Sequence, residues 1–396
     1  MMKKRILIVY NTLGVGGSTT SLLSLLNELD LTKYDVDLQL RGNGEFDSLI
    51  PQGINRLPDY MEAPETLMQK KRRSFHSWLH LLNALFRHKV NGNLNQRTQI
   101  MSLDSLHYCK DLEEGCYDVA ISYIEGLPLY YVVSKVHAKK YICWIHFDYK
   151  GGKFNPRYDF SYLEKADKIV LVSSSCKKNF DEIFPEFRHK TVYVENILSQ
   201  QFVIERSKQI INFTLPGKEC HRLKMVSVSR IDFSSKGLDR GINALAELKS
   251  KCMLSKELIW YILGDGLDFH TLDKMIREKG LTENVILCGS QSNPLPLVRQ
   301  CDVFFLPSRS EGKPMAVTEA LMLGLFVVAT RYSSAEEQIK DGENGLILEN
   351  TDKAILKFLA DLHNNCDWLL NKRKEMCQHD YSNTREYLKV EQLIDN

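Results

Sequence analysis

Residues 302–330, DVFFLPSRSEGKPMAVTEALMLGLFVVAT, contain the pattern that decides the fold. The apolar runs VFFL and FVVA near its two ends predict buried strands. Between these runs, Pro314 suits the first position of a helix that continues to about Leu323 and stops at Gly324. A strand, a helix and a second strand in this order indicate an α/β fold with a parallel sheet.

The same rhythm occurs in both halves of the 396-residue chain. A chain of this length exceeds what one hydrophobic core usually fills, so we expect two doubly wound α/β domains. The expected linker lies within 191–220, where an expected strand, TVYVEN, runs into a polar stretch. The expected buried strands are 5–10, 36–40, 119–123, 140–145 and 168–172 in the first domain, and 224–228, 258–263, 285–288, 303–306 and 326–329 in the second.

Composition narrows the class of protein. Hydrophobic residues make up 43% and charged residues 26%, which is ordinary for a soluble globular protein, and the net charge of +2 does not indicate a nucleic-acid binder. The ten cysteines show no CxxC pair, so neither a disulfide framework nor a zinc site is expected and a reducing cytosol fits best. The start of the chain lacks a signal-peptide core, and no run approaches a membrane span, so we expect the protein to stay inside the cell.

A glycine-rich turn, GVGGS at 14–18, follows the first expected strand and precedes a helical pattern. Gly16 and Gly17 would let backbone N–H groups approach a phosphate or carboxylate at the helix N-terminus. A tight turn that only closes the strand onto the helix is the alternative. A GxGxxG dinucleotide motif would need glycine in place of Thr19, although Asp37 is suitably placed for a ribose contact.

His146 emerges from the end of the expected strand YICWI. Strand ends of this kind face the ligand crevice in open α/β sheets, which makes His146 a candidate site residue. A histidine with only a structural role is the alternative.

Arg230 and Lys236 lie on one expected strand-to-helix loop of the second domain. Two cations on such a loop can hold a diphosphate, Arg through its planar fork and Lys as a movable point charge. The alternative is a solvated pair of surface charges.

Glu311 and Glu319 flank the expected helix start at Pro314. A carboxylate accepts well from the paired hydroxyls of a ribose or a sugar, and the amides of a helix N-terminus suit phosphates. This spacing indicates a nucleotide sugar as ligand. Alternatively, the two carboxylates only stabilise the helix dipole.

Taken together, the E-x7-E pair, GGSTTSLLSLLNEL, WIHFD, VSVSR, KGLD, LGDG, CGSQSNP and DGENGLI resemble the family-4 retaining glycosyltransferases of the GT-B fold. The resemblance spans nearly the whole chain and is strongest from Lys224 to Leu346. The tail RYSSAEEQIKDGENGLI is most similar to bacterial enzymes of capsular or other cell-surface polysaccharide assembly.

The resemblance implies two Rossmann-like domains that face each other across a deep cleft. It implies an acceptor-side domain at 1–199, a nucleotide-sugar-binding domain at 200–380, and a C-terminal helix, 381–396, that packs back on the first domain. Domain closure about the linker is expected for this architecture.

The resemblance also implies a role for each candidate residue. His146 and Glu311 would contact the transferred sugar at the reaction centre, Glu319 would bind the ribose and Gln291 would approach the base. The positive side chains would neutralise the leaving diphosphate, so no metal ion and no cofactor other than the nucleotide sugar, expected to be a UDP-sugar, are implied. The implied diphosphate-binding residues are Gly16, Gly17, Arg230, Lys236, Gly312, Lys313, Met315 and Ala316.

Two departures from the family pattern concern the specificity. Lys313 stands where a hydrophobic residue or glycine is usual, so the identity of the transferred sugar cannot be inferred from the family. In the family, the Asn-Pro segment usually contains an aromatic residue, whereas this chain has Asn293-Pro294-Leu295-Pro296. The resemblance therefore does not say which nucleobase the pocket binds.

The basic segment 68–89, MQKKRRSFHSWLHLLNALFRHK, has apolar residues at helical spacing. It could lie on an anionic membrane surface near a glycan or lipid-linked acceptor, at the inner face of the cell membrane. A helix packed into the core is the alternative. For the whole chain, a non-catalytic GT-B partner subunit and a sugar-nucleotide epimerase of the same fold remain alternatives to the transferase.

Overall fold

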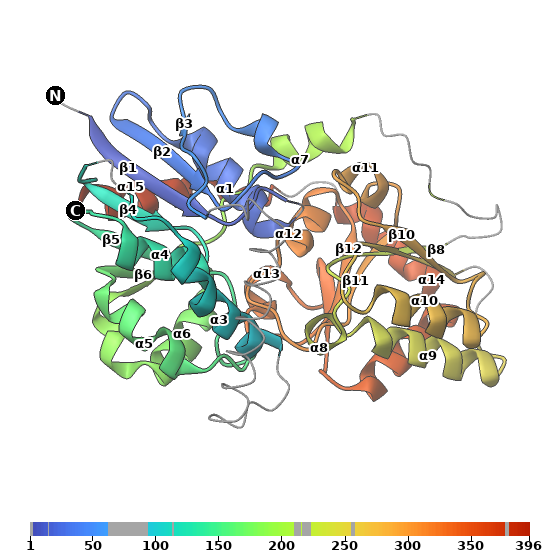
Figure 1. Cartoon of the computed structure of the whole chain (residues 1–396). Helices are drawn as coiled ribbons and strands as arrows, with labels where there is room; N and C mark the ends of the chain where they lie inside the picture. Colours follow the sequence, from blue (N-terminus) through green and yellow to red (C-terminus); the bar gives the residue numbers. More distant parts are fainter. Residues whose placement is uncertain are drawn as a thin grey trace. The chain divides into compact units, whose positions relative to one another are not determined.

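The structure is a computed structural model that describes residues 3–14, 16–61, 94–112, 115–209, 215, 223–254, 258–376 and 380–396. The chain forms two compact units, Met1–Ile197 with Arg385–Asn396 and Leu198–Thr384 (Figure 1). The basic segment 68–89, for which membrane contact was considered, lies outside the described residues.

The first unit contains a parallel 7-stranded sheet with the order β3-β2-β1-β4-β5-β6-β7. Its order reverses between β1 and β4, as in a doubly wound fold. Both faces of β1 are buried, because Ile6 and Ile8 belong to one apolar cluster while Leu7 and Val9 belong to another. The strands are β1 (Lys4–Tyr10), β2 (Tyr34–Leu40), β3 (Asn55–Arg56), β4 (Val119–Ser122), β5 (Tyr141–Ile145), β6 (Lys168–Leu171) and β7 (Thr191–Tyr193).

Helices connect these strands. The described helices of the first unit are α1 (Gly17–Glu28), α3 (Leu94–Ser105), α4 (Leu127–Lys135), α5 (Pro156–Lys165), α6 (Ser174–Ile183) and α15 (Tyr387–Asp395), with short turns η1 (Asp47–Leu49), η2 (Leu106–Tyr108) and η3 (Pro185–Lys190).

Helix α15 packs on the first unit, since Val390 and Ile394 belong to the apolar cluster of Tyr34. Its end is also held by Asp395, which accepts hydrogen bonds from Lys4 at 3.1 Å and from the Tyr34 hydroxyl at 3.1 Å. This helix was expected from residue 381, whereas it begins at Tyr387. Residues up to Thr384 belong to the second unit. There the Asn383 side chain accepts a hydrogen bond from the Leu198 amide at 2.8 Å.

The second unit contains a parallel 6-stranded sheet with the order β10-β9-β8-β11-β12-β13, which reverses between β8 and β11. The strands are β8 (Leu223–Val228), β9 (Leu258–Leu263), β10 (Val285–Gly289), β11 (Val303–Leu306), β12 (Phe326–Thr330) and β13 (Gly345–Leu348). The helices are α7 (Gln200–Ser207), α8 (Phe233–Lys236), α9 (Leu238–Ser250), α10 (Phe269–Glu278), α11 (Leu295–Val298), α12 (Met315–Met322), α13 (Ala335–Gln338), α14 (Asp352–Met376) and the turn η4 (Thr384–Glu386), whose last residues enter the first unit.

The expected strands all form, within two residues at each end. Two strands at the sheet edges were missed, because β3 has only two polar residues and β13 is a short run inside a turn-rich tail. The strand expected at the start of the linker, TVYVEN, forms as β7. The polar stretch after it includes helix α7, which was not predicted and which packs against α11 and α12. Across the described part of the chain, no helix combines the length and the apolar character that crossing a bilayer requires.

Candidate functional site

The reversal of strand order in the second unit brings two predicted site residues together. Lys236 follows β8 and Glu311 follows β11, the two strands between which the order reverses. The Lys236 Nζ donates hydrogen bonds to both carboxylate oxygens of Glu311, at 2.8 Å each. Ligands of open α/β sheets bind outside the carboxyl ends of the strands at such a reversal, so this pair lies where a ligand is expected.

The loop that presents Lys236 has a well-defined local structure. The Asp232 side chain caps α8 by accepting a hydrogen bond from the Ser234 amide at 2.9 Å. Gly237 ends α8 in the left-handed region, with φ 62°, and a Cβ there would lie 2.4 Å from the carbonyl oxygen of Pro307. Only glycine fits this position, where the loop after β8 meets the loop after β11.

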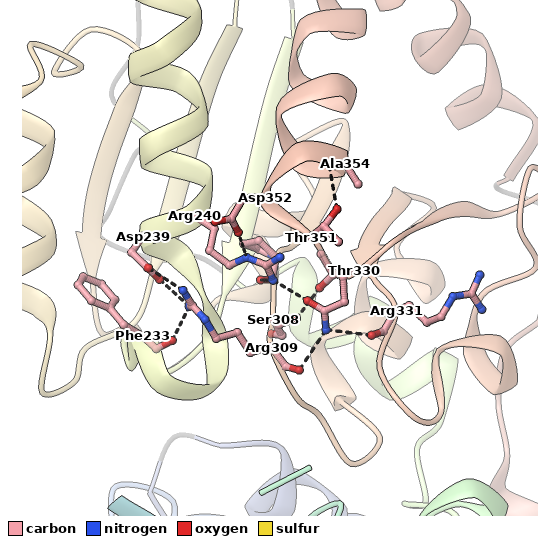
Figure 2. A network of polar contacts seen from close by, with 12 residues as sticks. Phe233, Asp239, Arg240, Ser308, Arg309, Thr330, Arg331, Thr351, Asp352 and Ala354 are labelled. Atoms are coloured by element: carbon pink, nitrogen blue, oxygen red, sulfur yellow. Dashed lines mark hydrogen bonds and ion pairs between the residues drawn. The ribbon is translucent and has the colours of Figure 1, made fainter. Parts of the chain in front are cut away.

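Arg309 joins the same two loops (Figure 2). Its guanidinium donates to both carboxylate oxygens of Asp239, at 2.8 and 2.9 Å, and to the Phe233 carbonyl at 2.6 Å. Its backbone N–H donates to the Ser235 carbonyl at 2.7 Å. A bidentate Arg–carboxylate pair defines its geometry well, so these contacts fix Lys236 relative to Glu311.

A second arginine, Arg240, is buried behind these loops (Figure 2). Its guanidinium donates to Asp352 and to Asn350, at 2.6 Å each, and to the Pro307 carbonyl at 3.3 Å. Because its charge is paired in this way, Arg240 supports the strand ends and is not exposed for a ligand.

Side chains of the segment after β12 donate hydrogen bonds to the backbone of the turn that contains Glu311. Ser334 donates to the Gly312 carbonyl, Ser333 donates to the Glu311 carbonyl at 3.3 Å, and Gln338 donates to the Pro314 carbonyl at 3.1 Å. Sequence reasoning quoted this segment only as part of a family resemblance. The sequence does contain a signal for these contacts. Ser333, Ser334 and Gln338 have side chains that can donate hydrogen bonds, and they follow a strand.

Helix α12 begins at Met315, so the prediction of Pro314 as its first residue was wrong by one position. Pro314 has extended dihedral angles, φ −67° and ψ 117°, and immediately precedes the helix. Among the described residues, no side chain caps this N-terminus. The amides of Met315 and Ala316, in the first turn of the helix, have no carbonyl of a preceding helical turn to which they can donate.

Glu319 lies one turn inside α12 and is half-buried. Burial raises the pKa of the Glu319 carboxyl, and the nearby positive charge of Arg206 lowers it in part. Arg206 comes from α7, a helix that the sequence analysis did not predict.

The side-chain contacts of two other predicted residues of this unit, Arg230 and Gln291, do not involve Lys236 or Glu311. Arg230 has a side chain 55% exposed, and its guanidinium lies 3.9 Å from the Asp232 carboxylate. Gln291 donates from its side chain to the Cys288 carbonyl of its own turn at 2.8 Å. Lys313 is half-buried.

In the first unit, the glycine-rich turn follows β1, the central strand at the order reversal. Gly16 is extended, with φ 169°, and no heavy atom lies within 4 Å of the position of a Cβ there. Neither backbone strain nor packing explains a glycine at this position. Helix α1 starts at Gly17, directly after this residue.

A buried cluster of hydroxyl groups under this turn was missed by sequence reasoning. The Tyr10 hydroxyl lies 2.6 Å from the Ser18 hydroxyl, and the Tyr123 hydroxyl lies 2.8 Å from the Ser21 hydroxyl. Ser21 also donates to the Asn196 side chain at 3.0 Å. These bonds fix the first turn of α1 on the ends of β1 and β4. The run STTS at the helix start was the signal in the sequence.

His146 follows β5 and is tied to the loop after β4. Its Nε2 is 2.9 Å from the Tyr123 carbonyl oxygen, and its backbone N–H donates to Glu125 at 2.8 Å. A carbonyl only accepts, so Nε2 bears the proton and Nδ1 carries a lone pair. Burial lowers the pKa of His146 to about 4, although the bond to Tyr123 opposes this shift. The imidazole is therefore neutral near pH 7, and among the described residues none hydrogen bonds to Nδ1.

The two parallel sheets and their strand orders define a protein of the GT-B fold. The solved structure of Anabaena HepE in complex with UDP and glucose matches this fold with a TM-score of 0.69 over 99% of each chain, at 13% identity. At this identity the likeness concerns the fold alone.

The sequence comparisons point to one family. Residues 216–381 match the family described as Glycosyl transferases group 1. An uncharacterized glycosyltransferase of Methanocaldococcus jannaschii is 26% identical over 56% of this chain and 55% of its own length. The N-acetylgalactosamine-N,N'-diacetylbacillosaminyl-diphospho-undecaprenol 4-alpha-N-acetylgalactosaminyltransferase of Campylobacter jejuni is 34% identical over 46% of this chain and 57% of its own length. The chain thus spans little more than half the length of these relatives.

Proposed function

We propose that the protein is a retaining glycosyltransferase that moves a hexose or a hexose derivative from a nucleotide sugar, with UDP as the expected carrier, to a glycan or lipid-linked acceptor of a cell-surface polysaccharide. The observation that carries this proposal is the Lys236–Glu311 pair at the order reversal of the second sheet. The relative from Campylobacter jejuni, whose name describes a sugar transfer to a diphospho-undecaprenol glycan, supports the acceptor class.

In this proposal the second unit binds the donor. Lys236 uses two of its three N–H donors on Glu311, which leaves one for a phosphate oxygen. The amides of Met315 and Ala316 and the exposed guanidinium of Arg230 supply further donors. The Glu311 carboxylate retains lone pairs for the hydroxyls of the transferred sugar, and Glu319 accepts from the ribose hydroxyls.

The chemistry follows from where charge develops. As the glycosidic bond to the diphosphate breaks, negative charge grows on the leaving group and positive charge on the sugar ring. Fixed N–H donors and cations that face the leaving group lower the barrier because they need no reorganisation. The leaving phosphate takes the proton of the attacking acceptor hydroxyl on the same face of the sugar, which gives retention.

Metal independence is part of the proposal, because Lys236 and Arg230 would supply the positive charge at the diphosphate. Among the residues that the structure describes, no three His, Cys, Asp or Glu side chains are grouped as metal ligands. The test is transfer in the presence of excess EDTA, described in the Discussion.

We further propose that the first unit binds the acceptor. Gly16 would allow close approach of the acceptor or of the donor diphosphate to the α1 N-terminus, where the fold itself does not require glycine. His146, as a neutral group, would accept a hydrogen bond at Nδ1 from a hydroxyl of the transferred sugar. The basic segment 68–89 would attach the protein to the anionic inner surface of the cell membrane.

The decisive experiment has two stages. Thermal shift with UDP-, GDP- and ADP-sugars identifies the donor, since a ligand that binds only the folded state raises the melting temperature. Transfer to membrane extracts of glycan acceptors is then measured with the donor that binds. Turnover that requires an acceptor supports the transferase. Conversion of the donor without acceptor would indicate an epimerase, and binding without any turnover would indicate a non-catalytic subunit.

The membrane part has its own test. Flotation with vesicles of phosphatidylglycerol and phosphatidylcholine is compared for the wild type and a variant with Lys70, Lys71, Arg72 and Arg73 changed to Gln. Loss of flotation in the variant is expected. Equal flotation of both proteins would contradict membrane attachment through this segment.

A further inference from the structure

Helix α7 is built into the donor half of the proposed site. Val203 of α7 packs in one apolar cluster with Leu295 of α11 and with Met315 and Met322 of α12. The helix therefore lies against both the helix that contains Glu319 and the short helix that follows the predicted base loop. From the sequence, this stretch was expected in the linker and at the start of the nucleotide-sugar-binding domain at 200–380, and no helix was predicted there.

Arg206 lies in the last turn of α7, with its guanidinium 5.6 Å from the centre of the Phe202 ring. Burial lowers the pKa of Arg206, and the charge of Glu319 raises it in part. The effect is reciprocal at Glu319, as described above. Of the other charged groups nearby, Glu205 lies on the same helix and accepts a hydrogen bond from Gln201 at 3.0 Å, and β12 has no titratable side chain.

The end of α7 is also fastened to the loop after β10. The Asn293 side chain donates to the Arg206 carbonyl at 2.9 Å and to the Gln209 side chain at 2.8 Å. Gln291, the residue predicted to approach the base, lies two positions earlier in this loop. The end of α7 thus contacts the loop that contains the predicted base-binding residue, and α7 itself packs on the helix that contains Glu319.

From this arrangement we infer that Arg206 is a positioning residue, which holds the Glu319 carboxylate ionised and in place to accept the hydroxyls of the donor ribose. The inference rests on the proposed function, because it assigns to Glu319 a nucleotide as its ligand. It goes beyond that function by making α7 a determinant of nucleotide affinity. An isolated, partly buried carboxyl would instead become neutral more readily and lose much of its strength as an acceptor.

The test compares nucleotides with and without ribose hydroxyls. Calorimetric affinities for UDP, GDP and ADP, each paired with its 2′,3′-dideoxy form, are measured for the wild type. The nucleotide pair bound most tightly is then measured for Glu319→Gln, Arg206→Met, Arg206→Gln and Arg206→Lys. The surface variant Arg277→Met on α10 is the matched control, since it also removes an arginine from a carboxylate partner.

We expect the wild type to prefer the ribose form by about tenfold or more, as for a hydrogen bond to a charged group. Glu319→Gln, Arg206→Met and Arg206→Gln should lose this preference, whereas Arg206→Lys and Arg277→Met should keep most of it. As pH falls, the preference of Arg206→Met should disappear at a higher pH than that of the wild type. A merely structural role of Arg206 would lower both affinities equally and leave their ratio and its pH dependence unchanged.

The possible failures are distinguishable. If Glu319→Gln loses the preference and both Arg206 variants without charge keep it, the inference is wrong and the proposed function stands. If the wild type binds none of the nucleotides, the proposed function is wrong and the inference falls with it. Because Gln is polar and tolerates contact with water, Arg206→Gln gives the answer should Arg206→Met fold poorly.

Discussion

The Lys236 ammonium donates to both oxygens of the Glu311 carboxylate, at 2.8 Å each, and the two side chains are only 19% and 7% exposed. Ser308 donates a further hydrogen bond to the same carboxylate, at 2.7 Å. The two residues were predicted separately, one for the phosphates and one for the sugar. Their direct pairing means that removal of either leaves the other charge partly buried without its partner.

Replacement of Lys236 by Met should therefore lower both stability and transfer. We expect a loss of about 3 kcal/mol in the free energy of unfolding, because the Glu311 carboxylate loses its counter-charge. Transfer should fall about 100-fold or more if Lys236 also stabilises the leaving diphosphate. Urea denaturation and initial rates measure the two effects.

The double variant Lys236→Met/Glu311→Gln separates these effects. Its stability should recover to within about 1 kcal/mol of the wild type, while its transfer should remain as low as that of the single variants. Lys251→Met is the control, since Lys251 pairs with Glu247 at an exposed site and should change stability by about 0.5 kcal/mol at most. Recovery of transfer in the double variant would contradict the assigned roles.

Two glycines should respond in opposite ways to alanine. Gly16→Ala should keep the free energy of unfolding within about 0.5 kcal/mol of the wild type, because the backbone at Gly16 is extended and a Cβ there meets no atom within 4 Å. Transfer by this variant should nevertheless fall at least about tenfold. Gly237→Ala should cost about 2 kcal/mol or more, because a left-handed φ and the Pro307 carbonyl both oppose a Cβ. Normal transfer by a stable Gly16→Ala enzyme would remove the proposed ligand contact at this turn.

His146 should make stability depend on pH in acid. Its pKa is lowered by burial to about 4 from an ordinary 6.5, so the unfolded chain binds more protons than the folded one between these values. Stability is therefore present in full above pH 6.5 and is lost as pH falls toward 4, by about 3 kcal/mol at most.

The measurement is the difference in unfolding free energy between the wild type and His146→Gln from pH 7.5 to pH 4. The variant should lose less stability over this range than the wild type. His270→Gln controls for removal of an exposed imidazole and should follow the wild type. Parallel pH curves for His146→Gln and the wild type would show that the imidazole is not held neutral.

Transfer should not depend on a divalent metal. With excess EDTA, the initial rate should stay within about twofold of the rate with added Mg²⁺, because fixed cations supply the charge at the leaving group. A loss of activity that Mg²⁺ or Mn²⁺ restores would assign the diphosphate contact to a metal ion instead of to Lys236 and Arg230.

The local pattern of the chain was sufficient for the fold class and for most strands. Buried parallel strands such as 258–263 are continuous apolar runs, and the glycines and prolines that end them are equally visible in the sequence. The spacing of Glu311 and Glu319 around a helix start was also legible, because helix periodicity and capping act over a few residues. Edge strands such as β3 lack this signal, since two polar residues make no run.

What the sequence determined by itself was which residue types follow which strands, because a strand, its turn and the next helix are set by neighbours in the chain. Only the tertiary structure decided which of these residues meet. Lys236 and Glu311 are 75 positions apart and pair because the strand order reverses between β8 and β11. Likewise, burial raises the pKa of Glu319 against the opposing charge of Arg206, and burial lowers the pKa of His146. Such contacts arise from packing between distant segments, and no local pattern encodes them.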